Sequence, residues 1–340
     1  MIDASTFTSS LLVPSVGIPI EMLGNAVQRT IEMRQQNSRL ASMIIPEYNV
    51  EEGLLSDNNY NMLRNLPGCE RENENLIPDA LALSCNVYCL TDNTAKAYHS
   101  QSFYSINNGW VWLNDYFKYP TSFLEISPKM HNFFKDIRDL PYIDKETGLV
   151  SGIFFQYINA KIIRIAYVTK GTTPTSLKDW GANFKQGWNG NSALYKKSSD
   201  NARYINKKLN DNIGDSGYLY FFGHSLGGGL ANYNAMKENR PSITFNAASI
   251  HPDSVISNMA NYNELVKNKA MIGIYVEGEV LSLNVSDTLG LPKNGNRYKV
   301  VISPKYLTNG NMVERHLLEP LCSQYGLHRM SWNNRIFVKI

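Results

Sequence analysis

The sequence GHSLG at residues 223–227 stands between two segments of different character. The short apolar and aromatic run before it, YLYFF at residues 218–222, predicts a buried strand. The segment GGLANYNAM at residues 228–236 predicts a helix. A G-x-S-x-G motif at such a strand-to-helix turn is typical of a nucleophile elbow, in which glycines permit a sharp bend. The pattern therefore predicts that the hydroxyl of Ser225 projects at the carboxyl end of a sheet.

Strand-like and helical segments alternate after about residue 150, and this alternation predicts the fold. Strands are expected at residues 152–158 and 162–168, which form a hairpin, and at 218–222, 242–247 and 270–276, with a helix near 192–209. The order predicts an α/β fold of the α/β-hydrolase type, whose mostly parallel central sheet carries helices on both faces.

The first 75 residues differ from the rest of the chain. An apolar start with prolines leads to a predicted helix at residues 22–43, and a polar stretch follows that ends in ERENEN at 70–75. We interpret residues 1–75 as an N-terminal extension, an export or partner segment, and residues 76–340 as the catalytic domain.

Composition sets limits on partners and location. The net charge of +3 is too small to argue for a nucleic-acid partner, and 43% hydrophobic residues suffice for a substantial core. No stretch approaches the roughly 18–20 apolar residues of a membrane span. Because no Lys or Arg precedes Arg29, a cleavable secretory signal is not expected. We therefore expect a protein that is secreted by a route without such a signal, is cytoplasmic before export and acts at membranes.

The four cysteines are interpreted as buried small hydrophobes of a reduced protein. Cys85 and Cys89 are four residues apart in a predicted helix, and Cys69 and Cys322 complete the set. A spacing of four stacks two side chains on one helix face without favouring a disulfide, and no metal-ligand spacing appears. No metal or organic cofactor is expected.

A serine nucleophile needs a base, and histidine suits this role because its pKa lies near neutrality. In the hydrolase fold built on this elbow the order along the chain is serine, acid, histidine, which disfavours the histidines before the serine. His224 lies inside the elbow, and His251 leaves too little room for an acid before it. His316 and His328 remain, and His316 is favoured because it follows the last predicted sheet elements and leads into a short helix. The six candidates are His99, His131, His224, His251, His316 and His328.

The acid should follow the strand at residues 270–276, whose carboxyl end opens on the same side as the elbow. Glu279 is favoured there because it lies in a loop after a glycine, and Asp287 and Asp253 are the alternatives. Its role would be to fix the histidine tautomer and stabilise the imidazolium. The oxyanion donors would be the backbone N–H groups of Leu226, which follows the nucleophile, and of Thr172, which follows an earlier strand.

These segments together resemble the class 3, or fungal-type, lipase family. GHSLGG at 223–228 is similar to the family's elbow, and AYVTKGT at 166–172 to its oxyanion loop, with Lys170 in place of the usual arginine. DWGAN at 179–183, VEGEV at 276–280 and ERH at 314–316 resemble its later segments, although Glu279 stands where aspartate is usual. The resemblance spans residues 76–321 and is greatest to bacterial secreted or effector phospholipases A1.

The resemblance implies a serine-dependent hydrolase of lipid carboxylic esters, with phospholipase A1 as the expected activity. Its substrate would be a phospholipid or another acyl lipid at a membrane or micelle interface, and an accessory or immunity protein would be a further partner. Triglyceride lipase, soluble esterase, thioesterase and acyltransferase activities remain open with the same residues. A non-catalytic lipid-binding module is the other alternative.

Overall fold

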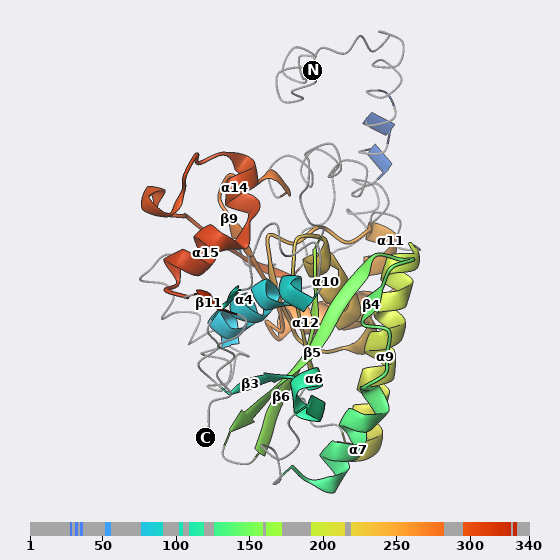
Figure 1. Ribbon diagram of the computed structural model, residues 1–340. Coiled ribbons are helices and arrows are strands. Elements are labelled where there is room, and N and C mark those ends of the chain that lie inside the picture. Colours follow the sequence, from blue (N-terminus) through green and yellow to red (C-terminus); the bar gives the residue numbers. More distant parts are fainter. Residues whose placement is uncertain are drawn as a thin grey trace.

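The chain is described by a computed structural model, drawn in Figure 1. The residues whose structure is described are 28, 31–32, 35–36, 52–55, 76–90, 102–104, 109–118, 126–158, 161–171, 192–214, 219–281, 295–327 and 329–331.

Among these residues, nine strands form the central sheet. The order across the sheet is β1-β10-β9-β8-β7-β6-β5-β3, and β4 pairs with β5 beside it. Every neighbouring pair from β1 to β6 is parallel, whereas β5 is antiparallel to β6, β3 and β4. The strands are β1 Glu52–Leu55, β3 Trp110–Trp112, β4 Ile143–Asp144, β5 Leu149–Ile158, β6 Lys161–Thr169, β7 Leu219–His224, β8 Ser242–Phe245, β9 Met271–Val276 and β10 Asn296–Val300.

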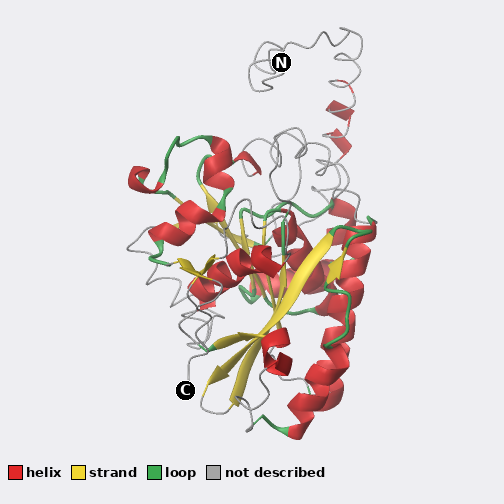
Figure 2. Cartoon of the chain, viewed as in Figure 1, coloured by secondary structure: helices red, strands yellow, loops and turns green. Residues whose placement is uncertain are grey.

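Helices connect these strands and lie on both sides of the sheet (Figure 2). A small second sheet pairs β2 Ser102–Tyr104 with β11 Arg329–Ser331. The helices are α4 Leu76–Asn86, α6 Leu113–Lys118, α7 Pro128–Ile137, α9 Ala193–Ile213, α10 Leu226–Glu238, α11 Pro252–Ile256, α12 Met259–Lys267, α14 Met312–His316 and α15 Leu318–Gln324, with 3-10 turns η2 Val87–Leu90 and η5 Pro304–Tyr306. The predicted α/β fold with a mostly parallel sheet is confirmed.

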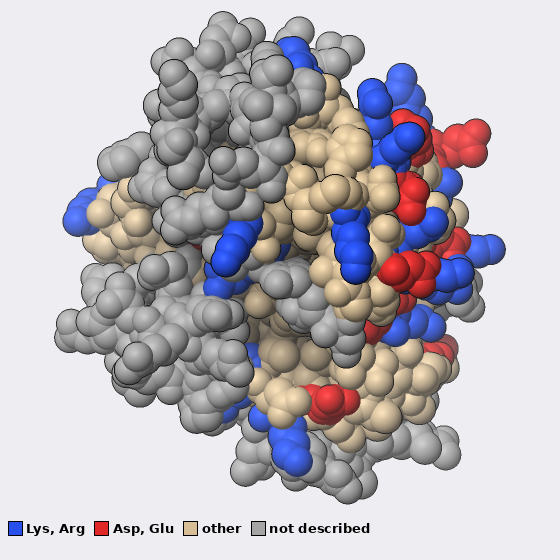
Figure 3. Space-filling model, turned by 90° about the horizontal axis from the view of Figure 1, so that it is seen from below, with Lys and Arg blue, Asp and Glu red and all other residues tan. Residues whose placement is uncertain are grey.

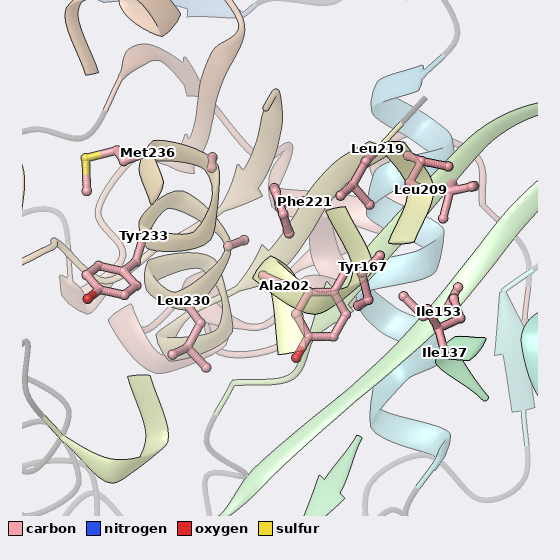
Figure 4. Close-up of a cluster of buried hydrophobic side chains, with 14 of the residues drawn as sticks. Ile137, Ile153, Tyr167, Ala202, Leu209, Leu219, Phe221, Leu230, Tyr233 and Met236 are labelled. Carbon is pink, nitrogen blue, oxygen red and sulfur yellow. The ribbon is translucent and has the colours of Figure 1, made fainter. Parts of the chain in front are cut away.

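The sheet is buried on both faces, and the alternation of side chains along each strand divides the core in two. Phe221 of β7 faces a cluster with α7, α9, α10 and α12, whereas its neighbour Phe222 faces a cluster with α4 and α15. In β5, Phe155 and Phe154 divide in the same way. Figure 4 shows the first cluster, where side chains of β5, β6 and β7 meet those of the covering helices.

Local sequence explains where the longer helices begin and end. Ser127 accepts a hydrogen bond from the N–H of Met130 at the start of α7, and Pro128 occupies the first turn. Ser192 caps α9 in the same manner, and that helix ends at Gly214, whose φ of 89° favours glycine. Compared with the predicted ranges, α4 ends at Asn86, so Cys89 lies in η2, and α10 begins at Leu226, two residues before the predicted helix.

The N-terminal region contributes one described strand to the sheet. β1 pairs in parallel with β10 through residues 52–55 and 297–300. This strand lies within the segment that we interpret as an N-terminal extension, and the domain boundary at residue 76 stays a prediction.

Charged side chains of both signs cover the outer helices. Figure 3 shows Lys and Arg interspersed with Asp and Glu on the side that carries α7 and α9. Lys208 of α9 joins Asp136 of α7 at 3.0 Å between nitrogen and oxygen, and Lys197 joins Asp144 at 3.3 Å. In the described part of the chain, the helices are too short or too polar to serve as a membrane span.

The aromatic cluster under α7 should carry a large share of the stability of this side of the core. The buried ring of Phe134 lies 4.6 Å from Phe155 and 5.2 Å from Tyr116 between ring centroids. We expect Phe134→Ala to lower the free energy of unfolding by about 3–5 kcal/mol, because the change removes buried surface and leaves a cavity. Urea unfolding followed by circular dichroism measures the loss. The partly exposed aromatic Tyr204 of α9 is the matched control, and Tyr204→Ala should cost less than about 1 kcal/mol; equal losses would contradict the expectation.

Candidate active site

The elbow forms at the turn between β7 and α10, as the motif predicts. Ser225 is buried and has φ 58° and ψ −129°, a backbone conformation that L-residues rarely adopt. Its backbone N–H donates to the carbonyl of Phe245 at 3.1 Å, and its own carbonyl accepts from Gly229 and Ala248. The neighbouring strand and the following helix therefore hold Ser225 in this conformation.

The turn depends on the close approach of Gly227 to the end of β6. A Cβ atom at Gly227 would lie 2.2 Å from the carbonyl oxygen of Thr169, so a side chain does not fit there. The hydroxyl of Thr169 donates to the carbonyl of Gly227 at 2.6 Å. This contact explains why a glycine run, which disfavours helices, begins α10.

The loop after β6 reaches the nucleophile. A Cβ atom at Gly171 would lie 2.9 Å from the Cβ of Ser225 and 2.7 Å from the hydroxyl oxygen of Tyr88. Gly171 thus lies directly against the serine, and only a residue without a side chain fits this space. Thr172, the predicted oxyanion residue, is the next residue and lies outside the described ranges.

His316 and Glu279 form a buried hydrogen-bonded pair, with side chains 1% and 0% exposed. The Nδ1 atom of His316 lies 2.5 Å from Oε2 of Glu279. Because a carboxylate accepts and cannot donate, Nδ1 carries the proton, and the Nε2 atom of the neutral ring is unprotonated. The same carboxylate oxygen accepts the backbone N–H of Leu281 at 2.8 Å, which fixes its direction.

His224 connects the turn at Ser225 to His316. His224 Nε2 lies 2.7 Å from the carbonyl oxygen of His316, so Nε2 must be the donor. In the neutral ring, Nδ1 then accepts from the hydroxyl of Tyr88 at 2.8 Å. Gly171 makes a backbone hydrogen bond to Tyr88, whose pKa is raised by burial. One line of hydrogen bonds therefore joins the loop after β6, η2, the elbow and α14.

Asn246, directly after β8, is a second link between the central sheet and His316. Its Nδ2 donates to the carbonyl of His316 at 2.9 Å and to that of Arg315 at 3.2 Å, and its Oδ1 accepts from the N–H of Val276 at 2.8 Å. The residue has a φ of 43°, in the left-handed region that asparagine tolerates. Asn246 thus fixes the end of α14 relative to β9, the strand that precedes Glu279.

The loop that leads into α14 is closed by Glu314. Its carboxylate accepts the backbone N–H groups of Thr308, Asn309 and Gly310, and these bonds, Thr308 first, hold the pKa of Glu314 below its usual value. Arg315 donates to the carbonyls of Gly310 and Glu277. Hydrogen bonds of Glu314 to residues 308–310 and of Arg315 to Gly310 and Glu277 therefore hold the segment that carries His316 in place.

A partly buried lysine lies beside this network. Lys170 Nζ lies 5.1 Å from the centre of the Tyr88 ring and donates to the carbonyl of Gly171 at 3.3 Å. Burial lowers the pKa of Lys170 to about 8. The ammonium thus contributes positive charge next to the loop that adjoins Ser225.

The other predicted candidates do not join His316 within the described structure, or lie outside it. Asp253 is largely exposed in α11 and lies 3.5 Å from Nδ1 of His251. Asp287 and His328 fall outside the described ranges. Within those ranges, the His, Cys, Asp and Glu side chains form no group of three or more able to hold a metal ion.

The comparison with known families places the chain in a phospholipase family. Residues 94–299, more than half of the chain, match the phospholipase-like family of Tle-like phospholipase domains. The chain belongs to this family. A Tle-like phospholipase is an ester hydrolase that acts on phospholipids. As a member of this family, the chain is a phospholipid-hydrolysing enzyme. None of the curated proteins compared with the chain matches it.

Only some residues of the candidate site lie within the segment that matches the family. Ser225 and Glu279 lie inside the part that matches the Tle-like phospholipase domain, whereas His316 lies beyond its end and Tyr88 before its start. Sequence reasoning singled out the first three of these and missed Tyr88 and Asn246. The only sequence signal for Asn246 was a polar residue at the end of a predicted strand, and Tyr88 gave none.

Asn246 should position the base without touching the substrate. We expect Asn246→Ala to lower kcat about 100-fold with a small change in KM, because the His316 segment loses an anchor and small displacements of a catalytic group are costly. Steady-state hydrolysis of phospholipid in mixed micelles measures both constants, with circular dichroism to verify folding.

Asn261 of α12 provides the matched control for that substitution. Its Nδ2 donates to the carbonyl of Met236 at 2.8 Å, a contact between α12 and α10. Asn261→Ala also removes a hydrogen bond from an asparagine side chain to a backbone carbonyl, but it should leave kcat within about twofold of the wild-type value. A kcat for Asn246→Ala equal to that of the control would rule out the positioning role.

Proposed function

We propose that this Tle-like phospholipase is a serine-dependent phospholipase A1 that cleaves its substrate through an acyl-serine intermediate. The observation that carries the proposal is the buried contact of 2.5 Å between His316 and Glu279, beside the strained turn that holds Ser225. A histidine oriented by a buried carboxylate is the arrangement that activates a serine hydroxyl.

In the proposed reaction, Ser225 Oγ attacks the ester carbonyl while His316 Nε2 takes its proton. The tautomer required for this step follows from the bond between Nδ1 and Glu279. The same nitrogen then delivers the proton to the leaving lysolipid alcohol, and a water molecule activated by His316 hydrolyses the acyl-serine. The carboxylate of Glu279 stabilises the imidazolium that forms in each half-reaction.

Negative charge on the carbonyl oxygen would be held by backbone donors. The N–H of Leu226 lies in the first turn of α10, where N–H groups have no acceptor within the helix and the helix dipole favours negative charge. Thr172 is the proposed second donor, and its support is the position of Gly171 against Ser225. Losing one such donor typically costs about 3–4 kcal/mol of transition-state stabilisation.

The choice of the sn-1 ester rests on the resemblance to class 3 lipases and, among them, to phospholipases A1. The segments that carry it include the AYVTKGT loop at residues 166–172 and the VEGEV loop at 276–280. Of these, the strand end before Gly171 and the loop with Glu279 border the candidate site. The substrate would be an aggregated phospholipid at a membrane or micelle surface.

The roles of the three side chains can be separated by substitution. We expect Ser225→Ala and His316→Ala each to lower kcat for phospholipid at least 10⁴-fold, roughly the loss seen when a triad member is removed. Glu279→Gln should lower kcat about 10³- to 10⁴-fold, because the neutral amide does not hold the same tautomer, whereas Glu279→Asp should retain part of the activity. Fatty-acid release from phosphatidylcholine vesicles is the measurement.

A serine away from the site serves as the control for these variants. Ser323→Ala, at an exposed position of α15, should react with a fluorophosphonate probe and hydrolyse phospholipid at the wild-type rate. Ser225→Ala should lose both properties. Probe labelling that persists in Ser225→Ala would show that another residue is the nucleophile.

The position of cleavage is tested with a phospholipid that carries different acyl chains at its two ester positions. We expect mass spectrometry of the products to show the sn-1 fatty acid and a 2-acyl lysophospholipid. Release of the sn-2 chain would contradict the A1 assignment. Faster turnover of triglyceride or of a short soluble ester would favour the lipase or esterase alternatives instead.

A further inference from the structure

Two cysteines that are far apart in sequence meet in the core. Cys85 lies near the end of α4 and Cys322 lies in α15, 237 residues later. Their Sγ atoms are 3.0 Å apart, and the residues are 5% and 0% exposed. In Figure 1, α4 and α15 lie side by side, and their contact joins the N-terminal and C-terminal ends of the described core.

We propose that Cys85 and Cys322 are a disulfide site, whose oxidised form fastens α15 to α4. A disulfide bond is about 2.05 Å long, so the two sulfur atoms need to approach by only about 1 Å more. The sequence favoured reduced, buried cysteines because it offered Cys85 and Cys89 as neighbours on one helix. In the structure both thiols are free and buried, and α4 ends before Cys89 while Cys322 of α15 lies against Cys85.

The oxidation needs an acceptor of two electrons, which a dithiol-disulfide exchange partner or a small-molecule disulfide such as oxidised glutathione supplies. One cysteine thiolate attacks a sulfur of that disulfide, which forms a mixed disulfide and releases one thiol. The second cysteine thiolate then attacks the protein sulfur, which forms the Cys85–Cys322 bond and releases the second thiol. Both cysteine protons pass to the two thiols that leave.

Burial determines when this exchange takes place. Burial raises the pKa of Cys85 well above its usual value, and the neighbouring Cys322 raises it further. The thiolate, which is the attacking form, is therefore scarce in the folded protein. Oxidation should proceed while the chain folds or when α15 opens, and the completed bond should resist reduction while the core stays closed.

The bond would act on the segments that hold the base. α15 begins two residues after His316, and α4 leads into η2, which carries Tyr88. Tyr88 and His316 are both hydrogen-bond partners of His224. A covalent link between α4 and α15 would therefore limit the separation of the two segments that contact His224 from opposite sides. Neither segment could leave the elbow without opening the core around the linked helices.

Disulfide mapping of the full chain tests the proposal directly. Protein refolded from the reduced, unfolded state in a glutathione redox buffer is alkylated, digested and analysed by mass spectrometry. We expect a peptide pair linked through Cys85 and Cys322 and alkylation of Cys69 and Cys89. Alkylation of Cys85 and Cys322 under these conditions, or a dominant pair that includes Cys69 or Cys89, would overturn the proposal.

A second measurement compares the thermal stability of the oxidised and reduced forms of the same protein. The oxidised protein should unfold roughly 5–10 °C above the same protein refolded and kept in dithiothreitol, because a cross-link over a long loop restricts the unfolded chain. Cys85→Ser and Cys322→Ser should abolish this difference, and Cys89→Ser, the control, should retain it. If the oxidised protein carries the bond but unfolds at the same temperature as the reduced protein, the proposal that the disulfide holds α15 to α4 is contradicted.

Discussion

The carbonyl oxygen of His316 is the point on which the arrangement of the site depends. It accepts hydrogen bonds from His224 of the elbow and from Asn246 after β8. The imidazole of the same residue meets Glu279, which follows β9. Three adjacent parallel strands thus determine the place of one residue that belongs to none of them. Because the carboxyl ends of parallel strands open at the same edge, short side chains suffice to make these links.

The fold and the turn that carries Ser225 could be predicted from the sequence because their signals are local. An aromatic strand, the GHSLG turn and the alternation of strands with helices each lie within a short stretch. Glu279 could be proposed because the order of elements places its loop at the edge where Ser225 lies, and the structure brings it to His316. The roles of the predicted oxyanion residue and of the alternative candidates Asp287 and His328 stay predictions.

Tyr88 and Asn246 could not be found in this way because their partners are distant in the chain. Tyr88 meets His224 across 136 residues, and Asn246 meets the carbonyl of His316 across 70. The partner of Asn246 is a backbone carbonyl, which every residue has, so the sequence does not indicate which residue accepts this hydrogen bond. The same reasoning applies to Cys85 and Cys322, whose contact depends on the packing of α4 against α15.

The parallel pairing of β1 with β10 has a consequence for the border of the catalytic unit. β10 lies between β9 and β1, so its backbone N–H and C=O groups are paired on both sides. A chain that began at residue 76 would leave one row of these groups open to solvent. An exposed edge of this kind is a template for strands of other molecules. With residues 52–55 present, the four-residue strand β1 forms this edge, and an expression boundary drawn after them would place the five-residue strand β10 there instead.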